Sequence, residues 1–306
     1  MDRHAITVLM STYNGELYIR EQLDSILNQN NVEVLLCVRD DGSSDNTLSI
    51  LSEYKNNYPE KIEVFNGENI GWKKSFFWLL QYAAENNSCE YFAFADQDDI
   101  WLPDKLITGI NVLQTLPAGS NLYFSNLLYY KNGINYGKIR KHNIVPTIKK
   151  CLVRNYATGC TIVFNRDLLQ LVGNNTPSIN VAHDYWLFQT AMLCGNVHYD
   201  PESFILYRQH ENNQIGFKNS KKDIWKRRIN NLSAMLRDHR TETQAKELYK
   251  LYGDKMPEYS QTAVIDLSCY RSNILRRIKL LCDNGFSMDS FSNNFWMKFK
   301  ILLGIL

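Results

Sequence analysis

The stretch Ala5-Ile6-Thr7-Val8-Leu9-Met10-Ser11-Thr12-Tyr13-Asn14-Gly15 decides the fold expected of this chain. Its first six residues form a short apolar run, which is typical of a buried strand in a parallel sheet. The remaining residues are mostly polar and predict a loop at the carboxyl end of that strand. Apolar residues with helical spacing follow over residues 16–28. A strand, a loop and a helix in this order predict the beginning of a βαβ unit.

The same alternation continues through the first third of the chain. Strands are expected at residues 32–38, 61–65 and 91–95, and helices at 45–58 and 72–86. This pattern indicates an α/β fold whose mostly parallel sheet is flanked by helices. Polar clusters at residues 11–14, 40–45 and 96–99 each follow a predicted strand. Because the loops after such strand ends form a ligand crevice, we expect the three clusters to share one site.

The rest of the chain divides into two parts. Further elements expected up to residue 216 are helices at 105–116, 167–172 and 183–194, strands at 122–130, 161–164 and 204–207, and a basic loop at 138–150. Helices alone are expected later, at 223–239, 241–252 and 260–283. We therefore predict a catalytic domain over residues 1–216 and a helical C-terminal region over residues 217–306.

Charge and cysteine content restrict the functional classes. Residues 1–216 hold 17 basic and 23 acidic residues, a net of −6, whereas residues 217–306 hold 17 and 9, a net of +8. The seven cysteines form no C-x-x-C pair, which argues against a disulfide framework and a structural zinc site. We find no signal peptide and no apolar run long enough to span a membrane. These features predict a cytoplasmic protein.

Asp96-Gln97-Asp98-Asp99 places three carboxylates within four residues. Ionising all of them without a cation is costly, because like charges repel at this separation. Mg²⁺ or Mn²⁺ takes oxygen ligands and would bridge to a diphosphate. A solvated acidic turn is the alternative, and the spacing alone leaves both open.

The other polar clusters also allow two interpretations. Asp41 either accepts a hydrogen bond from a nucleobase or belongs to an ordinary Asp-Ser-Gly turn, and Tyr13 either stacks on that base or covers the sheet edge. Asp184, at the start of a predicted helix, is either a general base or a favourable helix-dipole charge. His210 either completes a metal shell or is structural. No dinucleotide-binding or phosphate-loop motif occurs.

Taken in order, these clusters resemble glycosyltransferase family 2 and its GT-A fold. The motifs that carry the resemblance are Ser11-Thr12-Tyr13-Asn14-Gly15, Asp40-Asp41-Gly42-Ser43, Asn69-Ile70-Gly71, Asp96-Gln97-Asp98-Asp99-Ile100-Trp101, Ala157-Thr158-Gly159-Cys160, His183-Asp184-Tyr185-Trp186 and Tyr207-Arg208-Gln209-His210. Each motif alone is weak, but their common order is specific. The resemblance does not cover the chain beyond about residue 217.

The resemblance implies a role for each matching residue. Contacts to the nucleotide sugar are implied for Ser11, Tyr13, Asn14, Asp41, Gly71, Asp96, Gln97 and Asp98. Asp98 is the main implied metal ligand, with Asp96 and His210 completing the shell of Mg²⁺ or Mn²⁺. Contacts to the transferred sugar and acceptor are implied for Asp99, Trp101, Gly159 and Trp186. Asp184 matches the catalytic base of an inverting displacement.

The residues of these motifs are most similar to those of the rhamnosyltransferase-type branch, whose members build bacterial surface polysaccharides such as O-antigen or capsule. That branch implies a dTDP-L-rhamnose donor and a glycan or lipid-linked glycan acceptor. A transferase of UDP-linked Gal, GlcNAc, GalNAc or Glc is the first alternative, and transfer onto a lipid phosphate is a second. A non-catalytic carbohydrate- or nucleotide-binding module is an alternative of a different class.

The C-terminal region is basic and ends in apolar residues. Phe291, Phe295, Trp296 and Phe299 precede the apolar end of the chain at residues 301–306. This pattern is consistent with packing on the core or on a second subunit in a homodimer. It is equally consistent with peripheral contact to the inner face of the cell membrane, where a lipid-linked acceptor is found. Nucleic acid is not an expected partner, because no recognition motif accompanies the charge.

Overall fold

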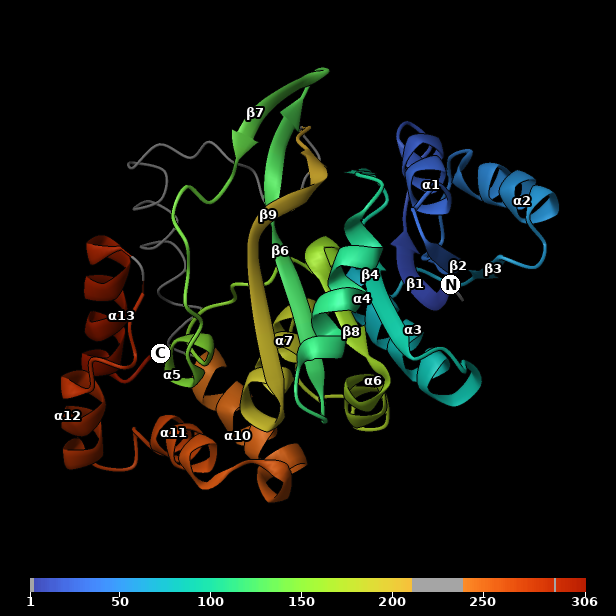
Figure 1. The fold of residues 1–306 in the computed structure, drawn as a ribbon. Helices are drawn as coiled ribbons and strands as arrows, with labels where there is room; N and C mark the ends of the chain where they lie inside the picture. Colours follow the sequence, from blue (N-terminus) through green and yellow to red (C-terminus); the bar gives the residue numbers. More distant parts are fainter. Residues whose placement is uncertain (1–2, 211–238, 289) are drawn as a thin grey trace.

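The computed structural model describes residues 3–210, 239–288 and 290–306, which form a curved sheet flanked by helices (Figure 1). The strands are β1 (His4–Thr12), β2 (Val32–Asp40), β3 (Ile62–Asn66), β4 (Tyr91–Ala95), β5 (Ile100–Trp101), β6 (Asn121–Lys131), β7 (Ile134–Lys138), β8 (Ile162–Asn165) and β9 (Asn196–Arg208). The α-helices are α1 (Ile19–Leu27), α2 (Thr47–Asn57), α3 (Trp72–Asn86), α4 (Lys105–Thr115), α5 (Ile148–Cys151), α6 (Arg166–Gly173), α7 (His183–Cys194), α10 (Arg240–Tyr252), α11 (Glu258–Ser268), α12 (Ile274–Cys282) and α13 (Phe291–Leu303).

The sheet has the order β3-β2-β1-β4-β8-β6-β9-β5, with β7 paired to β6. β3, β2, β1 and β4 are parallel neighbours, so the carboxyl ends of these strands lie on one edge, as predicted. β8 then joins β4 and β6 in antiparallel fashion, and β6 runs parallel to β9. The expected α/β fold is confirmed.

Successive residues of β1 face opposite sides of the sheet, and each side has its own core. Leu9 lies in the cluster formed with α3, α6 and α7, whereas Ile6, Val8 and Met10 lie in the cluster formed with α1, α2 and α4. This burial on both faces is why the strand is a continuous apolar run rather than an alternating one.

The structure differs from the sequence-based expectation in five places. The strand expected at 204–207 begins at residue 196, and the basic loop at 138–150 contains the start of α5. The short strands β5 and β7 were not predicted. β5 pairs with β9, which is distant in the chain, whereas β7 forms a hairpin with the preceding strand β6. The helix expected at 260–283 is divided into α11 and α12, because the Asn273 side chain accepts from the Arg276 N–H and begins a new helix. The helix expected at 223–239 lies outside the described residues.

The C-terminal helices share a core with the sheet. Leu248 and Tyr252 of α10 and Val264 of α11 belong to the same buried cluster as Trp186 of α7. The predicted boundary between residues 216 and 217 lies outside the described residues. In the parts of the chain that are described, no helix is both long and apolar enough to cross a membrane.

Candidate active site

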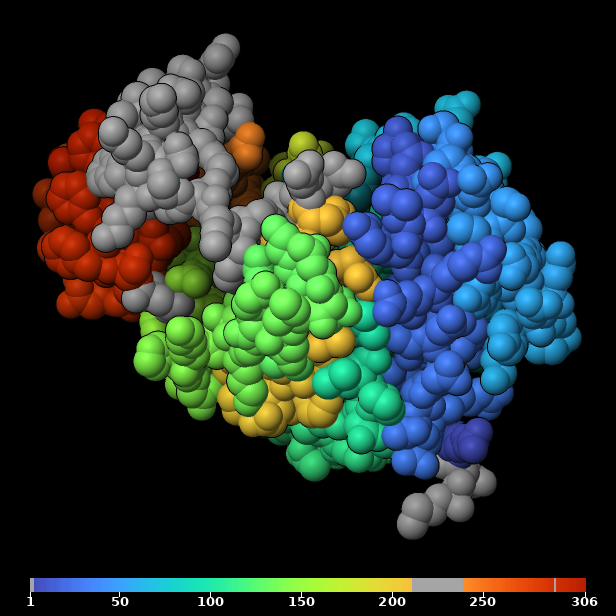
Figure 2. All heavy atoms as spheres, turned by 90° about the horizontal axis from the view of Figure 1, so that it is seen from above, coloured from blue at the N-terminus to red at the C-terminus, as the bar shows by residue number. Residues whose placement is uncertain are grey.

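A cavity of about 580 Å³ opens at the carboxyl edge of the parallel strands. One wall consists of residues after β1, β2 and β4, and the opposite wall consists of the 158–159 segment, the first turn of α7 and the end of β9. Figure 2 looks down on this region, where the blue N-terminal residues face the yellow end of β9. The three predicted polar clusters therefore do meet at one site.

Asp41, which follows β2, is buried and held by several donors. One carboxylate oxygen accepts from Arg39 and from the Ile70 N–H at 3.0 Å, and the other accepts from the Gly71 N–H at 2.8 Å. Gly71 has a φ of 84°, which favours glycine and lets its N–H point at this carboxylate. Because a carboxylate oxygen accepts about two hydrogen bonds, the Gly71-bonded oxygen keeps one site that faces the cavity.

Gln97 joins the end of β4 to the loop after β1. Its side-chain amide accepts from the Tyr13 N–H at 2.8 Å and donates to the Tyr13 carbonyl at 3.0 Å. The ring of Tyr13 is 48% exposed and lines the cavity, so its face is open to a planar ligand. Asn14, with a φ of 48°, accepts from the Ser44 N–H at 2.8 Å and closes the loop against the turn after β2. Ser11 lines the floor and donates to Ser75 at 2.7 Å.

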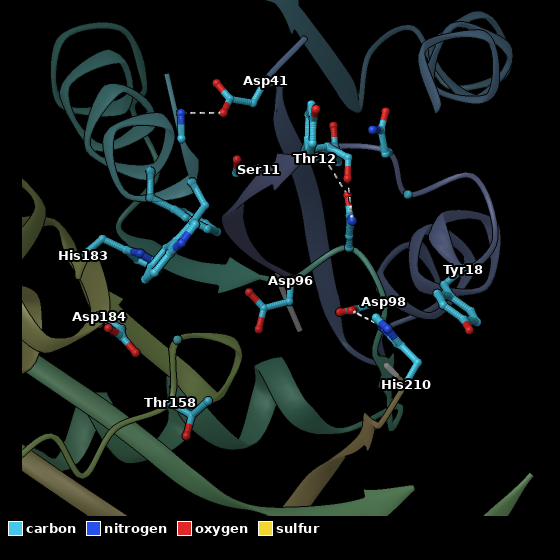
Figure 3. A pocket seen from close by; sticks show the side chains of 18 of the residues that line it. Ser11, Thr12, Tyr18, Asp41, Asp96, Asp98, Thr158, His183, Asp184 and His210 are labelled. Carbon is cyan, nitrogen blue, oxygen red and sulfur yellow. Dashed lines mark hydrogen bonds and ion pairs between the residues drawn. The ribbon is translucent and has the colours of Figure 1, made fainter. Parts of the chain in front are cut away.

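The acidic run separates into two environments. Asp96 and Asp98 face the cavity (Figure 3), and Asp98 lies 2.7 Å from the imidazole Nε2 of His210. Burial, together with the charges of Asp98 and Asp184, raises the pKa of Asp96 to about 7. Asp99 points away from the cavity and accepts from the Arg208 N–H at 3.1 Å. Burial raises its pKa well above the usual range, with Asp98 and Asp96 adding to the effect.

Two donor sets are candidates for holding a cation. Asp96, Asp99 and Cys160 bring three ligand atoms within 4.8 Å of one another. Burial raises the pKa of the Cys160 thiol, so this set offers a protonated sulfur behind the cavity wall. Asp96, Asp98 and His210 instead offer oxygen and imidazole donors inside the cavity. This second set fits a hard divalent ion better, because Mg²⁺ and Mn²⁺ prefer oxygen and nitrogen over thiol.

Asp184 stands on the opposite wall, at the first turn of α7 (Figure 3). Burial raises its pKa to about 6, while hydrogen bonds from the Tyr185 N–H, the Asn155 side chain and the Gly159 backbone limit the rise. The carboxylate is therefore mostly ionised at neutral pH, yet close enough to its pKa to exchange a proton. Gly159 lies directly against it, since a side chain there would meet Asp184 at 3.6 Å and His183 at 3.2 Å.

His183 is a cavity residue that the sequence did not single out. Its ring stacks on Phe76 with centroids 3.7 Å apart, and neither ring nitrogen has a hydrogen-bond partner among the described residues. Burial lowers its pKa to about 3, so the ring is neutral. Thr158, Tyr18 and Trp72 also line the cavity, and none of them was assigned a role from the sequence. Tyr18 stacks on His210 at 5.0 Å, a contact between distant segments that local patterns do not reveal.

Three residues expected near the sugar lie outside the cavity. Asp99 and Trp186 have no exposed surface, and Trp101 is 3% exposed. The indole N–H of Trp186 donates to the Tyr252 hydroxyl at 3.1 Å, so this side chain points toward the C-terminal helices. The ring of Trp101 covers the ammonium group of Lys105 at 3.6 Å. None of the three lines the cavity, so this placement does not support direct sugar contact by these residues.

The fold and the cavity together define a nucleotide-sugar glycosyltransferase of the GT-A type. The profile of glycosyl transferase family 2 matches residues 7–173. The chain is 34% identical to the dTDP-rhamnosyl transferase RfbG of Shigella flexneri over 233 residues, which cover 71% of this chain and 77% of that protein. The chain belongs to glycosyl transferase family 2, and its likeness to the rhamnosyltransferase-like branch is confirmed.

Two further comparisons agree with this assignment. The chain is 29% identical over 202 residues to an Escherichia coli enzyme, the UDP-Glc:alpha-D-GlcNAc-diphosphoundecaprenol beta-1,3-glucosyltransferase WfgD, and covers 73% of it. The mannosyltransferase PcManGT of Pyrobaculum calidifontis, solved with GDP-Man and Mn²⁺, has a TM-score of 0.52 and 14% identity, with coverage of 99% of this chain and 86% of that one. Several other matching glycosyltransferases are longer, and this chain spans about a third of their length.

Proposed function

We propose that the protein is a metal-dependent, inverting glycosyltransferase that moves L-rhamnose from dTDP-L-rhamnose to a hydroxyl of a glycan or lipid-linked glycan in surface-polysaccharide synthesis. The likeness to RfbG supports the donor. The observation that carries the mechanism is the placement of Asp184 across the cavity from Asp96, Asp98 and His210.

The donor would lie along the strand-end wall. Tyr13 offers an exposed ring face for the base, and Asp41 offers its remaining acceptor site to a base N–H. Asn14 and Gln97 shape this loop, while Ser11 and Gly71 line it. Asp98, His210 and Asp96 would hold Mg²⁺ or Mn²⁺, which when bound neutralises charge on the departing diphosphate.

Asp184 would act as the general base. Its carboxylate takes the proton from the acceptor hydroxyl while that oxygen forms a bond to the anomeric carbon. The bond between this carbon and the nucleoside diphosphate breaks on the opposite face, so the configuration inverts. A base with a pKa near 6 is well matched to this task, because it is ionised at neutral pH and still basic enough to accept the proton.

The buried residues Asp99, Trp101 and Trp186 would support the site from behind. Asp99 accepts from the backbone of Arg208 and so fixes the end of β9 that leads to His210. Trp186 fixes α7 against α10. Direct contact with the sugar then falls to Gly159 and to His183, whose ring is neutral.

The test is a panel of dTDP-L-rhamnose, UDP-Glc, UDP-GlcNAc, UDP-Gal, UDP-GalNAc and GDP-Man, with and without Mn²⁺. We expect Mn²⁺-stimulated release of dTDP from dTDP-L-rhamnose and a product whose anomeric configuration, read by NMR, is opposite to that of the donor. Metal-independent release or a retained configuration would contradict the proposal. Preferential use of a UDP-sugar would instead support the alternative donor class that the likeness to WfgD favours.

We further propose that the C-terminal region, residues 217–306, contacts the inner face of the cell membrane. Apolar side chains on α12 and α13 are exposed, with Leu275 74% and Phe291 89% accessible. Arg276 and Lys298 lie on the same two helices, and residues 274–306 hold five basic and two acidic residues. Exposed apolar and basic residues together match the surface of an anionic leaflet.

Sedimentation with phosphatidylglycerol vesicles tests this contact. The full chain should sediment with anionic vesicles, and the variant Leu275→Asp/Phe291→Asp should remain in the supernatant. If the wild type fails to sediment but forms a dimer that the same variant dissociates, the helices cover a second subunit in a homodimer and the membrane proposal is wrong.

A further inference from the structure

A second cavity, of about 390 Å³, lies outside the site described above. Four basic side chains line it, namely Arg140, Lys141, Lys150 and Arg154, together with His142. No acidic residue is among the described residues that line it. A concave surface that carries several cations, with no carboxylate among the described part of its lining, is suited to an anion that carries more than one negative charge.

The basic cavity is built on ordered contacts rather than on loose surface lysines. The backbone N–H of Arg140 donates to the Asn126 side chain at 3.1 Å, and the Asn126 amide donates back to the Arg140 carbonyl at 2.8 Å. The Arg140 guanidinium also donates to the carbonyl of Tyr156. Arg154 lies over the ring of Tyr156 at 5.0 Å. These contacts hold two arginines on one wall before any ligand arrives.

Two neighbouring lysines on α5 have different roles. Lys149 pairs with Asp283, 2.7 Å away, and thereby ties α5 to the chain after α12. Lys150 turns into the cavity instead. The chain after α12 thus packs against α5, which also contributes Lys150 to the basic cavity.

The two cavities share a wall. Tyr156 lines the basic cavity, and Thr158, two residues later, lines the catalytic one. Consecutive Cα atoms are about 3.8 Å apart, so these two residues are separated by at most roughly 7.6 Å. Asn155, in the same segment, is hydrogen-bonded to the carboxyl group of Asp184. The segment that lines the basic cavity at Tyr156 thus continues directly to the residues beside the base.

We infer that the basic cavity holds the diphosphate of the acceptor, a sugar joined through a diphosphate to a lipid, while the sugar reaches the catalytic cavity. This inference rests on the proposed function, because it needs a hydroxyl acceptor at Asp184. The diphosphate would contact Lys141 and Lys150 together with the two arginines. The lipid would leave toward α12 and α13, which carry the exposed apolar residues.

The experiment measures binding of geranyl diphosphate, inorganic pyrophosphate and geraniol to the full-length protein by calorimetry. Divalent cations are omitted and dTDP is added in excess, so that the catalytic cavity does not compete for the diphosphate. The wild type should bind both diphosphates and not geraniol. The variant Lys141→Ala/Lys150→Ala should bind them at least about tenfold more weakly.

A matched control removes the same charge elsewhere. Lys55 and Lys61 are exposed and lie at α2 and before β3, far along the sheet from α5. Lys55→Ala/Lys61→Ala should bind geranyl diphosphate as the wild type does. Equal weakening in both double variants, or no weakening in Lys141→Ala/Lys150→Ala, would overturn the inference.

The probes also distinguish the source of the phosphate. Tighter binding of geranyl diphosphate than of pyrophosphate supports a lipid-linked ligand, and equal binding supports a site for the diphosphate group itself. Equal binding of geraniol and geranyl diphosphate overturns the inference, because charge would then not be recognised. Release of nucleoside diphosphate from the donors, measured on the same preparations, reports on the proposed function separately.

Discussion

The two walls of the catalytic cavity differ in how far their polar groups are satisfied. On the strand-end wall, Asp41 and Gln97 are both engaged in hydrogen bonds with neighbouring loops. On the opposite wall, both ring nitrogens of His183 lack partners among the described residues, and burial raises the pKa of Asp184. The loops around Asp41 on the first wall are preorganised, whereas Asp184 on the second wall, like Asp96 at the end of β4, is held at an electrostatic cost.

This difference indicates that the two walls have different functions. A wall with satisfied polar groups keeps its shape and is suited to binding a donor repeatedly in one pose. A wall with perturbed groups is suited to chemistry, because a shifted pKa near neutrality allows proton transfer. The predictions below test whether the walls are in fact separate in function.

Asp184→Asn should have the largest effect. Removing a positioned base typically costs about 10²–10⁴-fold in turnover. Because the donor is proposed to bind along the other wall, binding of dTDP with Mn²⁺, measured by thermal shift, should not change. Asp167→Asn is a matched control, since Asp167 is an exposed aspartate in the first turn of α6. Near-normal turnover of Asp184→Asn would remove this residue from the base role.

Asp98→Asn should impair the proposed metal site, whose ligands come from both walls of the cavity. Asp98 follows β4 and His210 follows β9, and their side chains lie 2.7 Å apart. Loss of one metal ligand should reduce Mn²⁺-stimulated turnover at least about tenfold and weaken Mn²⁺ affinity. Even mutation of a residue that only hydrogen-bonds a metal ligand typically costs about 10–100-fold in metal affinity or activity. Asp104→Asn, at an exposed position before α4, serves as the control. An unchanged Mn²⁺ dependence in Asp98→Asn would instead favour the donor set of Asp96, Asp99 and Cys160.

The pH dependence should include the ionisation of Asp184 on the second wall. Asp184 must be ionised to act, and its pKa is raised to about 6. Below that pH, kcat/KM should therefore fall about tenfold per pH unit, and above it the acid limb should level off. An aspartate with the ordinary pKa of about 3.9 would keep activity down to about pH 4. A profile that stays flat from pH 7 to pH 4.5 would contradict the assignment.

Tyr252→Phe should have the smallest effect, and on stability rather than on chemistry. The Tyr252 hydroxyl accepts from the Trp186 indole and donates to the Asn175 carbonyl at 2.9 Å. Its removal leaves two buried groups without a partner, at a cost of roughly 1–3 kcal/mol. The midpoint temperature of thermal unfolding should fall, while turnover changes less than about twofold. Tyr249→Phe, at an exposed position on the same helix, should behave as wild type.

The strand-end wall was predictable from the sequence because its signals are local. Each polar cluster directly follows an apolar run, and parallel strands place such clusters on one edge. The position of Asp41, Asp96 and Asp98 in one cavity needed no knowledge of distant contacts. The sequence left two interpretations of His210 open, and local patterns could not choose between them, since its neighbour Asp98 is 112 positions away.

The opposite wall was predicted less well for a physical reason. Eight of the twelve residues of α7 are buried, so no amphipathic stripe reveals which side faces the cavity. His183 was therefore overlooked, and Trp186 was expected near the sugar although it faces α10. The basic cavity was also not foreseen, because it forms only when residues 140–145 fold back on residues 150–156.

The first turn of α7 also restricts how this enzyme can diverge. An α-helix advances about 100° per residue, so Asp184 and Trp186 point in nearly opposite directions, one into the cavity and one into the protein. One residue gained or lost inside this turn would rotate the base out of the cavity and bring another side chain into its place. We therefore expect length changes among relatives to accumulate in the segment between α6 and α7, and residues 183–186 to keep a fixed spacing while the sugars they handle diversify.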